Sequence, residues 1–345
     1  MSTRAQRAHP GPLFLLRDRT DPRCHRRALI DAHRKHRPNP LTTTLTSLPD
    51  SLLALAGDTE RRYQVYPLVN GSKRRWIEAP DRELKAAQRW LLDHWLYQLA
   101  PTDAAHGFVR GRSIVSNAGH HVGRDWVVTA DLSNFFPSIG ADRVSQVIAG
   151  LDLNANASDA VVRLVTRRRR LPQGAPTSPH LANLVARRLD LRLIGWARRG
   201  GWNYTRYADD LTFSGEGNPR TLLLTVERIV QDEGFTLAPG KTHVMPRHQR
   251  QLVTGMVVNE RVTLPKPRRR LLRAMLHRLQ TTGADAVDPG QLQIAQGHLA
   301  LAHFVDPERF QAECRALADL LRGEASPQAD TPNPTVCTPI DKKVD

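Results

Sequence analysis

The chain of 345 residues has few cysteines. Its three thiols, at Cys24, Cys314 and Cys337, lie far apart and form no CxxC pair. Neither a disulfide framework nor a thiolate zinc site is therefore expected. The fourteen histidines do not change this, because pairs such as His33 and His36 lack the cysteine or carboxylate partners that a metal site requires.

Long hydrophobic runs are also missing. No apolar stretch approaches the roughly 20 residues that a membrane-spanning helix needs. The apolar run Pro12–Leu16 is too short for the core of a secretory signal peptide. We therefore expect a cytoplasmic protein without a membrane partner.

Acidic residues are outnumbered by basic ones. There are 34 Asp and Glu against 50 Lys and Arg, which gives a formal net charge of +16 and a pI near 10.7. This charge favours a partner that carries many negative charges, and nucleic acid is the first candidate.

Three segments have clear periodic or β-rich patterns. Glu83–Leu99 repeats apolar residues at three- and four-residue spacing behind a capping Asp81, which predicts a helix with one buried face. Trp126–Leu132 is short and β-rich, as a buried strand would be. Pro219–Glu233 predicts a second helix, with Asn218 as its cap.

The sequence divides into four parts. Residues 1–60 form a basic N-terminal extension, and 61–260 contain the β-rich patterns and the motifs described below. Residues 261–322 predict a small basic helical bundle, whose apolar positions include Leu271, Leu272, Met275, Leu276 and Leu279. Residues 323–345, rich in Pro, Thr, Ser and Asp, are expected to be a disordered tail.

Two adjacent acids stand in the stretch YTRYADDLTFS, residues 204–214. Its flanks predict two strands, with Ala208, Asp209 and Asp210 at the tight connection between them. Neighbouring carboxylates repel unless they share a proton or a cation, and a divalent ion with oxygen ligands is the usual solution. Asp131, at the end of the upstream strand, would complete a set able to hold two Mg²⁺ ions about 3.5–4 Å apart for nucleotidyl transfer. The alternative is that the acids serve only the turn.

Four motifs occur in a fixed order: VVTADLSNFFPSI, LPQGAPTSPHLANL, YTRYADDLTFS and GFTLAPGKTHV. In this order the chain resembles the bacterial reverse transcriptases, from about Tyr63 to about Asn259. The resemblance implies an α+β right-hand polymerase with fingers, a palm whose antiparallel sheet carries the YADD hairpin, and a helical thumb in residues 261–322. It makes 61–260 the fingers and palm.

The resemblance also implies residue roles. Asp131, Asp209 and Asp210 would be the catalytic metal ligands for two Mg²⁺ ions, for which Mn²⁺ can substitute. Phe136 would be the steric gate that selects deoxynucleotides. The alternatives are that Phe136 is a core residue, or that the adjacent Phe135 is the gate. Further residues would surround the incoming nucleotide: Lys73, Arg75, Gln173, Gly174 and Lys241. The sequence departs from the family pattern at Ala238, where an asparagine is usual three positions before the lysine.

Two further elements match the retron reverse transcriptases. They are the NAxxH element at Asn117–His121 and the VTG element at Val253–Gly255. A helix start capped by Ser116 or Asn117, and a plain strand with a glycine, are the alternatives. The resemblance implies RNA or primer contacts by Asn117, His121, Val253, Thr254, Gly255, Lys266, Arg268, Arg269 and Arg270.

A retron enzyme would be an RNA-directed DNA polymerase. The resemblance implies that it uses deoxynucleoside triphosphates to copy part of its cognate structured non-coding RNA into multicopy single-stranded DNA. It also implies RNA trimming by a host RNase H, a separately encoded effector protein and a role in anti-phage defence. The alternatives are another bacterial reverse transcriptase, group II intron-derived or defence-associated, and a non-catalytic RNA-binding scaffold.

Overall fold

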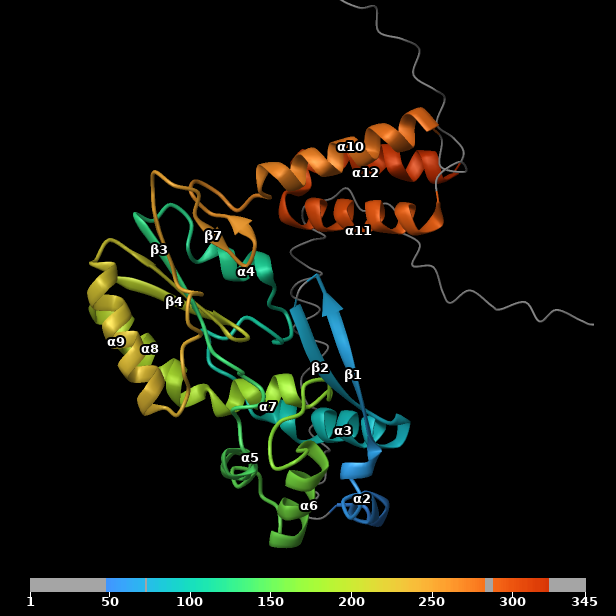
Figure 1. The fold of residues 1–345 in the computed structure, drawn as a ribbon, viewed down its shortest axis with the longest axis vertical. Helices are drawn as coiled ribbons and strands as arrows, with labels where there is room; N and C mark the ends of the chain where they lie inside the picture. Colours follow the sequence, from blue (N-terminus) through green and yellow to red (C-terminus); the bar gives the residue numbers. More distant parts are fainter. Residues whose placement is uncertain (1–47, 72, 283–287, 323–345) are drawn as a thin grey trace, which may run out of the picture. The chain divides into compact units, whose positions relative to one another are not determined.

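The computed structural model describes residues 48–71, 73–282 and 288–322 (Figure 1). The predicted disordered tail and most of the predicted N-terminal extension lie outside the described residues. So does the side chain of Lys73. The predicted division at 60/61, 260/261 and 322/323 stays a prediction.

A β-hairpin and a helix follow the first described residues. After α2 (Asp50–Leu55) and a short 3-10 turn, β1 (Tyr63–Asn70) pairs antiparallel with β2 (Lys73–Pro80). Then α3 (Arg82–His94) begins where the Asp81 carboxylate accepts a hydrogen bond from the Leu84 amide at 2.8 Å. The predicted cap is confirmed, but the helix ends at His94 and a 3-10 turn, Leu96–Gln98, continues the predicted segment.

A four-stranded antiparallel sheet forms the centre of the fold. Its strands are β3 (Trp126–Asp131), β4 (Trp202–Tyr207), β5 (Asp210–Gly215) and β6 (His243–Pro246). Their order is β4-β5-β3-β6, so β3 lies between β5 and β6. The register pairs Asp131 with Asp210. This pairing brings the two acidic segments of the sequence to one end of the sheet.

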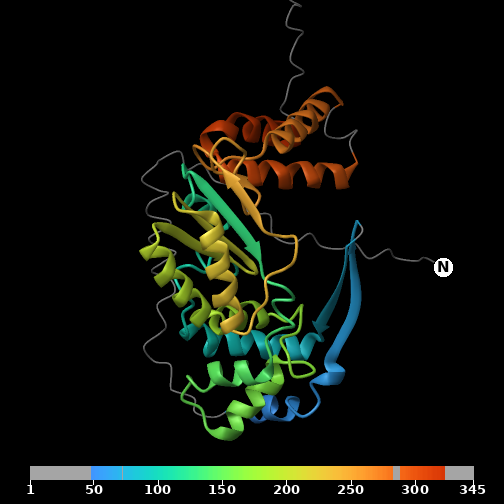
Figure 2. The same cartoon turned by 60° about the vertical axis from the view of Figure 1, so that its left-hand side comes forward.

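Five helices pack next to this sheet or against one another beside it. They are α5 (Ala141–Ile148), α6 (Ala155–Val165), α7 (Ser178–Val185), α8 (Arg187–Arg199) and α9 (Pro219–Asp232). Both views show α8 and α9 along one face of the sheet (Figures 1 and 2). The predicted Asn218 cap of α9 is confirmed, since its side chain accepts from the Arg220 amide.

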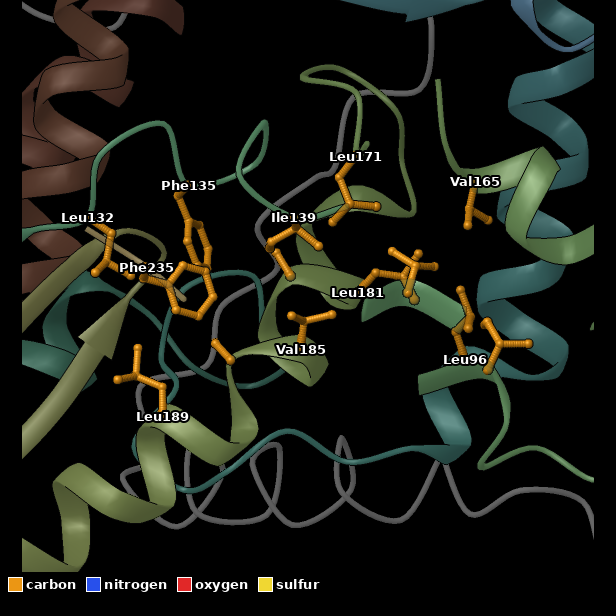
Figure 3. Packing of buried hydrophobic residues seen from close by; sticks show 14 of the residues in the cluster. Leu96, Leu132, Phe135, Ile139, Val165, Leu171, Leu181, Val185, Leu189 and Phe235 are labelled. Atoms are coloured by element: carbon orange, nitrogen blue, oxygen red, sulfur yellow. The ribbon is translucent and has the colours of Figure 1, made fainter. Parts of the chain in front are cut away.

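The main hydrophobic core lies where these helices, the loop after β3 and α3 meet. Figure 3 shows Leu132, Phe135, Ile139, Leu181 and Leu189 among its members. Leu132 and Phe135 follow the acid at position 131 almost directly. The segment that carries this acid is therefore fixed by packing on its C-terminal side.

A second core joins the sheet to the C-terminal helices. Its elements are α4 (Ile114–Gly119), β7 (Leu252–Val253), β8 (Met256–Val257), α10 (Lys266–Thr282), α11 (Pro289–Val305) and α12 (Pro307–Arg322). Val127 of β3 and Ala118 of α4 pack with apolar residues of the three last helices. The predicted helical bundle is thus present, although Leu271 is 48% exposed rather than part of the core, because it lies on the outer side of α10.

The expected α+β architecture with an antiparallel hairpin-bearing sheet is confirmed. Across the described ranges, none of the helices combines the length and the apolar character that crossing a membrane demands.

Candidate active site

The three acids meet at one end of the central sheet. Ala208 and Asp209 form the two-residue connection between β4 and β5, and Asp210 is the first residue of β5. Ala208 has a φ of +59°, in the left-handed region where glycine is the usual residue. Across the sheet, the Leu132 amide donates to the Asp209 carbonyl at 2.8 Å. The backbone therefore holds the acidic turn against the end of β3.

The carboxylates destabilise one another. Burial, followed by the charges of Asp131 and Asp209, raises the pKa of Asp210 to about 7. Burial also raises the pKa of Asp209, with Asp131 adding to the effect. One oxygen of Asp210, Oδ1, is buried without a hydrogen-bond partner. A cation at this position would relieve the repulsion and engage the unpaired oxygen.

Two basic residues act on these carboxylates. The Lys241 ammonium donates to Asp131 Oδ2 at 2.8 Å, and this contact raises the pKa of the lysine. Burial raises the pKa of Asp209, whereas the charges of Lys241 and Arg75 lower it. Arg75 comes from the β1–β2 hairpin and Lys241 from the loop before β6. The fold thus brings both of these predicted nucleotide-binding residues to the acidic cluster.

The residues present fit a hard divalent cation in their chemistry. Among the described residues, no three or more Asp, Glu, His or Cys side chains converge closely enough to hold an ion as they stand. At this site the Lys241 ammonium forms an ion pair with Asp131. Three carboxylates, one with an orphaned oxygen and a raised pKa, are nonetheless a donor set suited to Mg²⁺ or Mn²⁺. The metal-ligand assignment stays a prediction.

The Gln173–Gly174 loop is pressed against β2. The Glu78 amide donates to the Gln173 carbonyl at 2.9 Å, and a Cβ on Gly174, whose φ is +142°, would lie 2.7 Å from the Glu78 carbonyl oxygen. Glu78 also forms a buried ion pair with Arg167. Arg167, the first residue of the arginine run 167–170, is thus buried and already paired, so its charge is not available to a phosphate.

The two adjacent phenylalanines differ in exposure. Phe135 is buried in the core, and Phe136 is partly exposed beside it, with ring centroids 5.6 Å apart. The exposed Phe108 lies 6.2 Å from Phe136 on another side. Only Phe136 of the pair is accessible enough to contact a sugar. This difference supports the choice of Phe136 as the gate, which stays a prediction.

The positions of Asn117 and His121 do not fit direct RNA contact. Both side chains are fully buried. The His121 ring hydrogen-bonds Ser214 at 2.8 Å and Thr205 at 2.7 Å, and burial lowers its pKa to about 3, so the ring is neutral. It therefore connects the segment after α4 to β4 and β5. Asn117 lies inside α4, whose cap is Ser113, so neither Asn117 nor Ser116 begins the helix.

The VTG element forms the tight turn between β7 and β8. Val253 is buried, whereas Thr254 and Gly255 occupy the turn with φ of +46° and +78°. The Thr254 hydroxyl donates to the Ile114 carbonyl at 3.0 Å. The turn is thus anchored on α4, and its glycine is exposed.

The predicted RNA-binding residues of the thumb lie in the first turns of α10. Lys266 and Arg270 are exposed, and Arg268 and Arg269 are partly exposed. Among the described residues, none of the four forms an ion pair with a carboxylate. Cations are unfavourable near a helix N-terminus, so helix stability does not explain their position. Their charges are available to an anionic partner.

Sequence patterns assign no role to two buried residues behind the acidic turn, Arg206 and Asp190. They form an ion pair with no exposed side-chain surface. A signal was present, because Arg206 alternates with the aromatic Tyr204 on a strand with a buried face. Strand periodicity could therefore have predicted that Arg206 is buried, but it could not have predicted that Asp190 on α8 is its ion-pair partner.

Comparisons with known proteins agree with this geometry. The family described as "Reverse transcriptase (RNA-dependent DNA polymerase)" matches residues 67–258, more than half of the chain. Retron Mx162 reverse transcriptase of Myxococcus xanthus is 38% identical over 79% of this chain and 64% of its own length. Retron Mx65 reverse transcriptase of the same organism is 40% identical over 70% of this chain and 60% of its own length.

A third relative is matched over a larger share of its length. Retron Ec86 reverse transcriptase of Escherichia coli is 35% identical over 67% of this chain and 74% of that protein. The chain belongs to the reverse transcriptase family, and within it to the retron-type enzymes. It spans less than two thirds of the length of the two Myxococcus relatives.

The raised pKa of Asp210 predicts a pH-dependent stability. Between the ordinary value of 3.8 and about 7, the folded protein keeps a proton on Asp210 that the unfolded chain has lost. Folding therefore loses stability as the pH rises through this window. We expect Asp210→Asn to increase the free energy of unfolding of the metal-free protein by on the order of 2 kcal/mol at pH 8, and by almost nothing at pH 4.

Urea unfolding followed by circular dichroism in EDTA measures this difference. Asp58→Asn, at an exposed position, is the matched control and should change little at either pH. A stabilisation by Asp210→Asn that is equal at both pH values, or larger at pH 4, would contradict the assigned cause.

Proposed function

We propose that the protein is an RNA-directed DNA polymerase of a retron. The observation that carries this proposal is the register of β3 and β5, which places Asp131 beside Asp210 and the turn residue Asp209. Arg75 and Lys241 act on the same cluster. Clustered carboxylates with flanking cations suit the transfer of a nucleotide, whose reacting groups are phosphates and metal ions.

Reverse transcriptases use divalent metal ions, and here we assign two Mg²⁺ ions, replaceable by Mn²⁺, to Asp131, Asp209 and Asp210. When bound, they would lower the pKa of the attacking hydroxyl and stabilise charge on the departing pyrophosphate. Arg75 offers a planar fork for the triphosphate, supported by Lys73. Lys241 is placed to exchange its contact with Asp131 for one with the pyrophosphate.

The remaining contacts would select and hold the substrates. Phe136 would lie against the deoxyribose of the incoming nucleotide, and the Gln173–Gly174 loop against the templating base pair. The VTG turn at Thr254 and Gly255 would support the primer end. The basic start of α10 would bind the phosphate backbone of the cognate RNA, because stem-loops are recognised largely through backbone and shape.

The template would be a structured non-coding RNA, copied in part into multicopy single-stranded DNA from deoxynucleoside triphosphates. The names of the three relatives support the retron type over another bacterial reverse transcriptase. RNA trimming by a host RNase H, a separate effector protein, anti-phage defence and a cytoplasmic location complete the proposal. Asn117 and His121 take no direct part in RNA contact, since both are buried.

The first test removes the charges of the acidic turn. Asp209→Asn with Asp210→Asn should abolish DNA synthesis, by at least about a thousandfold, because the metal-binding carboxylates are lost. RNA binding should remain, since the basic surface is unchanged. Primer extension with Mg²⁺ and filter binding of RNA measure the two properties.

The matched control carries the same change of charge at exposed positions, Asp58→Asn with Asp159→Asn. It should extend primers at the wild-type rate. Normal extension by the doubly substituted turn variant would refute the site assignment.

The second test concerns the sugar gate. Phe136→Ala should admit ribonucleotides, because the ring that would clash with a 2′-OH is removed. Incorporation of ATP relative to dATP should rise by about 10-fold or more, as expected when a bulky exclusion of this kind is lost. Phe136→Tyr, which retains the ring, should preserve the preference. If Phe136→Ala still excludes ribonucleotides, the gate lies elsewhere.

The third test concerns RNA choice. General phosphate contacts weaken steeply with salt, whereas selection of one folded RNA requires specific contacts as well. We expect that replacing residues 262–322 with the matching segment of a related retron enzyme redirects the protein to the other enzyme's RNA. Copying of a generic primed template should survive. Sequencing the RNA retained after a moderate salt wash decides the outcome, and continued choice of the original RNA would refute thumb recognition.

A further inference from the structure

Arg206 is a fully buried arginine directly behind the acidic turn. It lies on β4, and all of its guanidinium contacts are internal. Its Nε donates to Asp190 Oδ1 at 2.8 Å, and its Nη2 donates to Asp190 Oδ2 at 2.7 Å. Its Nη1 donates to Asn183 Oδ1 at 2.9 Å and to the Ala208 carbonyl at 3.0 Å. The last contact reaches the residue that precedes Asp209.

The acidic partner of Arg206 is saturated with hydrogen bonds. Besides the two from Arg206, Asp190 accepts one from the Tyr204 hydroxyl at 2.8 Å and one from the Thr102 hydroxyl at 2.7 Å. A buried ion pair of this kind usually adds little to stability compared with apolar packing, because desolvation offsets the attraction. The function of this ion pair is therefore better sought in the fixed position of the guanidinium than in a contribution to stability.

Ala208 is confined at both its carbonyl group and its amide group. Arg206 holds its carbonyl oxygen, while on the other side a Cβ on Gly107 would lie only 2.5 Å from the Ala208 amide nitrogen. Asn183 joins the two sides, since it accepts from Arg206 and donates through Nδ2 to the Gly107 carbonyl at 2.8 Å. The enclosure maintains the left-handed φ of +59° at Ala208, which an alanine does not readily adopt.

The same guanidinium also lies 5.7 Å from the ring centroid of Phe135, the buried neighbour of Phe136. Arg206 thus contacts both segments that carry the proposed chemistry: the acidic turn directly, and the Phe135–Phe136 pair through the first ring.

We propose that Arg206 is a positioning residue whose hydrogen bond to Ala208 sets where the Asp209 and Asp210 carboxylates stand. Asn183 and Gly107 complete this arrangement. The inference rests on the proposed polymerase function, which it deepens. Lysine cannot replace the arginine here, because a single ammonium cannot span both oxygens of Asp190 and still reach Ala208 and Asn183.

The test compares Arg206→Lys with two controls on α8. Arg192→Lys changes an ion pair at the surface, and Leu193→Val weakens the core without touching the turn. We expect Arg206→Lys to lower kcat by about 10- to 100-fold, because small displacements of catalytic groups have effects of this size. The KM for deoxynucleotides should change less than about twofold, since Arg75 still binds the triphosphate.

Two measurements do not depend on DNA synthesis. Mn²⁺ binding to the protein, followed by electron paramagnetic resonance, should weaken at least about fivefold in Arg206→Lys, because the carboxylates no longer stand in one arrangement. Hydrogen exchange should accelerate in the peptide spanning residues 205–211 but not in β3. Both controls should keep wild-type Mn²⁺ binding, and their kcat should be unchanged per folded molecule.

A second variant covers the case in which Arg206→Lys does not fold. Gly107→Ala adds one methyl group against the Ala208 backbone, so the turn must shift, and it should give the same pattern of reduced kcat and Mn²⁺ binding. Gly195→Ala on α8, where a Cβ meets nothing within 4 Å, is its matched control.

The outcomes separate the two proposals. Wild-type kcat and Mn²⁺ binding in folded Arg206→Lys, or in Gly107→Ala, would overturn the positioning role. So would losses that Leu193→Val reproduces at an equal reduction of Tm. If the wild-type protein synthesises no DNA, the polymerase function is refuted, and Mn²⁺ binding with hydrogen exchange still decides the role of Arg206.

Discussion

Mutual repulsion of three carboxylates is the constraint on which the arrangement of this protein depends. The fold places Asp131, Asp209 and Asp210 together although burial and their like charges raise the pKa of Asp210 to about 7. In the absence of an ion, Lys241 offsets part of this repulsion. Three features hold the acids together: the β3–β5 register, the core after Leu132 and the hydrogen bond from Arg206 to the Ala208 carbonyl.

Several residues at and near the acidic turn have conformations or environments that are unfavourable for stability. Ala208 has a left-handed backbone, and Asp210 carries an unpaired buried oxygen. Thr254 is a β-branched residue with positive φ at the VTG turn, held by its bond to the Ile114 carbonyl. Strain of this type persists only where the surroundings impose it. Here those surroundings are the buried contacts of β4, α4 and the loop that contains Gly107.

Much of the fold could be predicted from the sequence, because it depends on local signals. The caps Asp81 and Asn218 and the hairpin around Ala208 were each specified by a few neighbouring residues. The errors concern residues whose environment is made by distant segments. His121, in the segment after α4, is buried with hydrogen-bond partners on β4 and β5, Thr205 and Ser214. Arg206 has its counterion on a helix, and no spacing rule connects it to Asp190.

The β1–β2 hairpin is attached to the Gln173–Gly174 loop through Glu78 of β2. Glu78 is held in two ways: its amide donates to the Gln173 carbonyl, and its carboxylate forms an ion pair with Arg167. Between Glu78 and the tip of the hairpin, the apolar residues Leu68, Val69 and Trp76 are largely exposed. Arg75 lies in this exposed part of β2, three residues before Glu78. The position of its guanidinium relative to the carboxylates is therefore set where the hairpin is attached at Glu78, and not by packing around Arg75 itself.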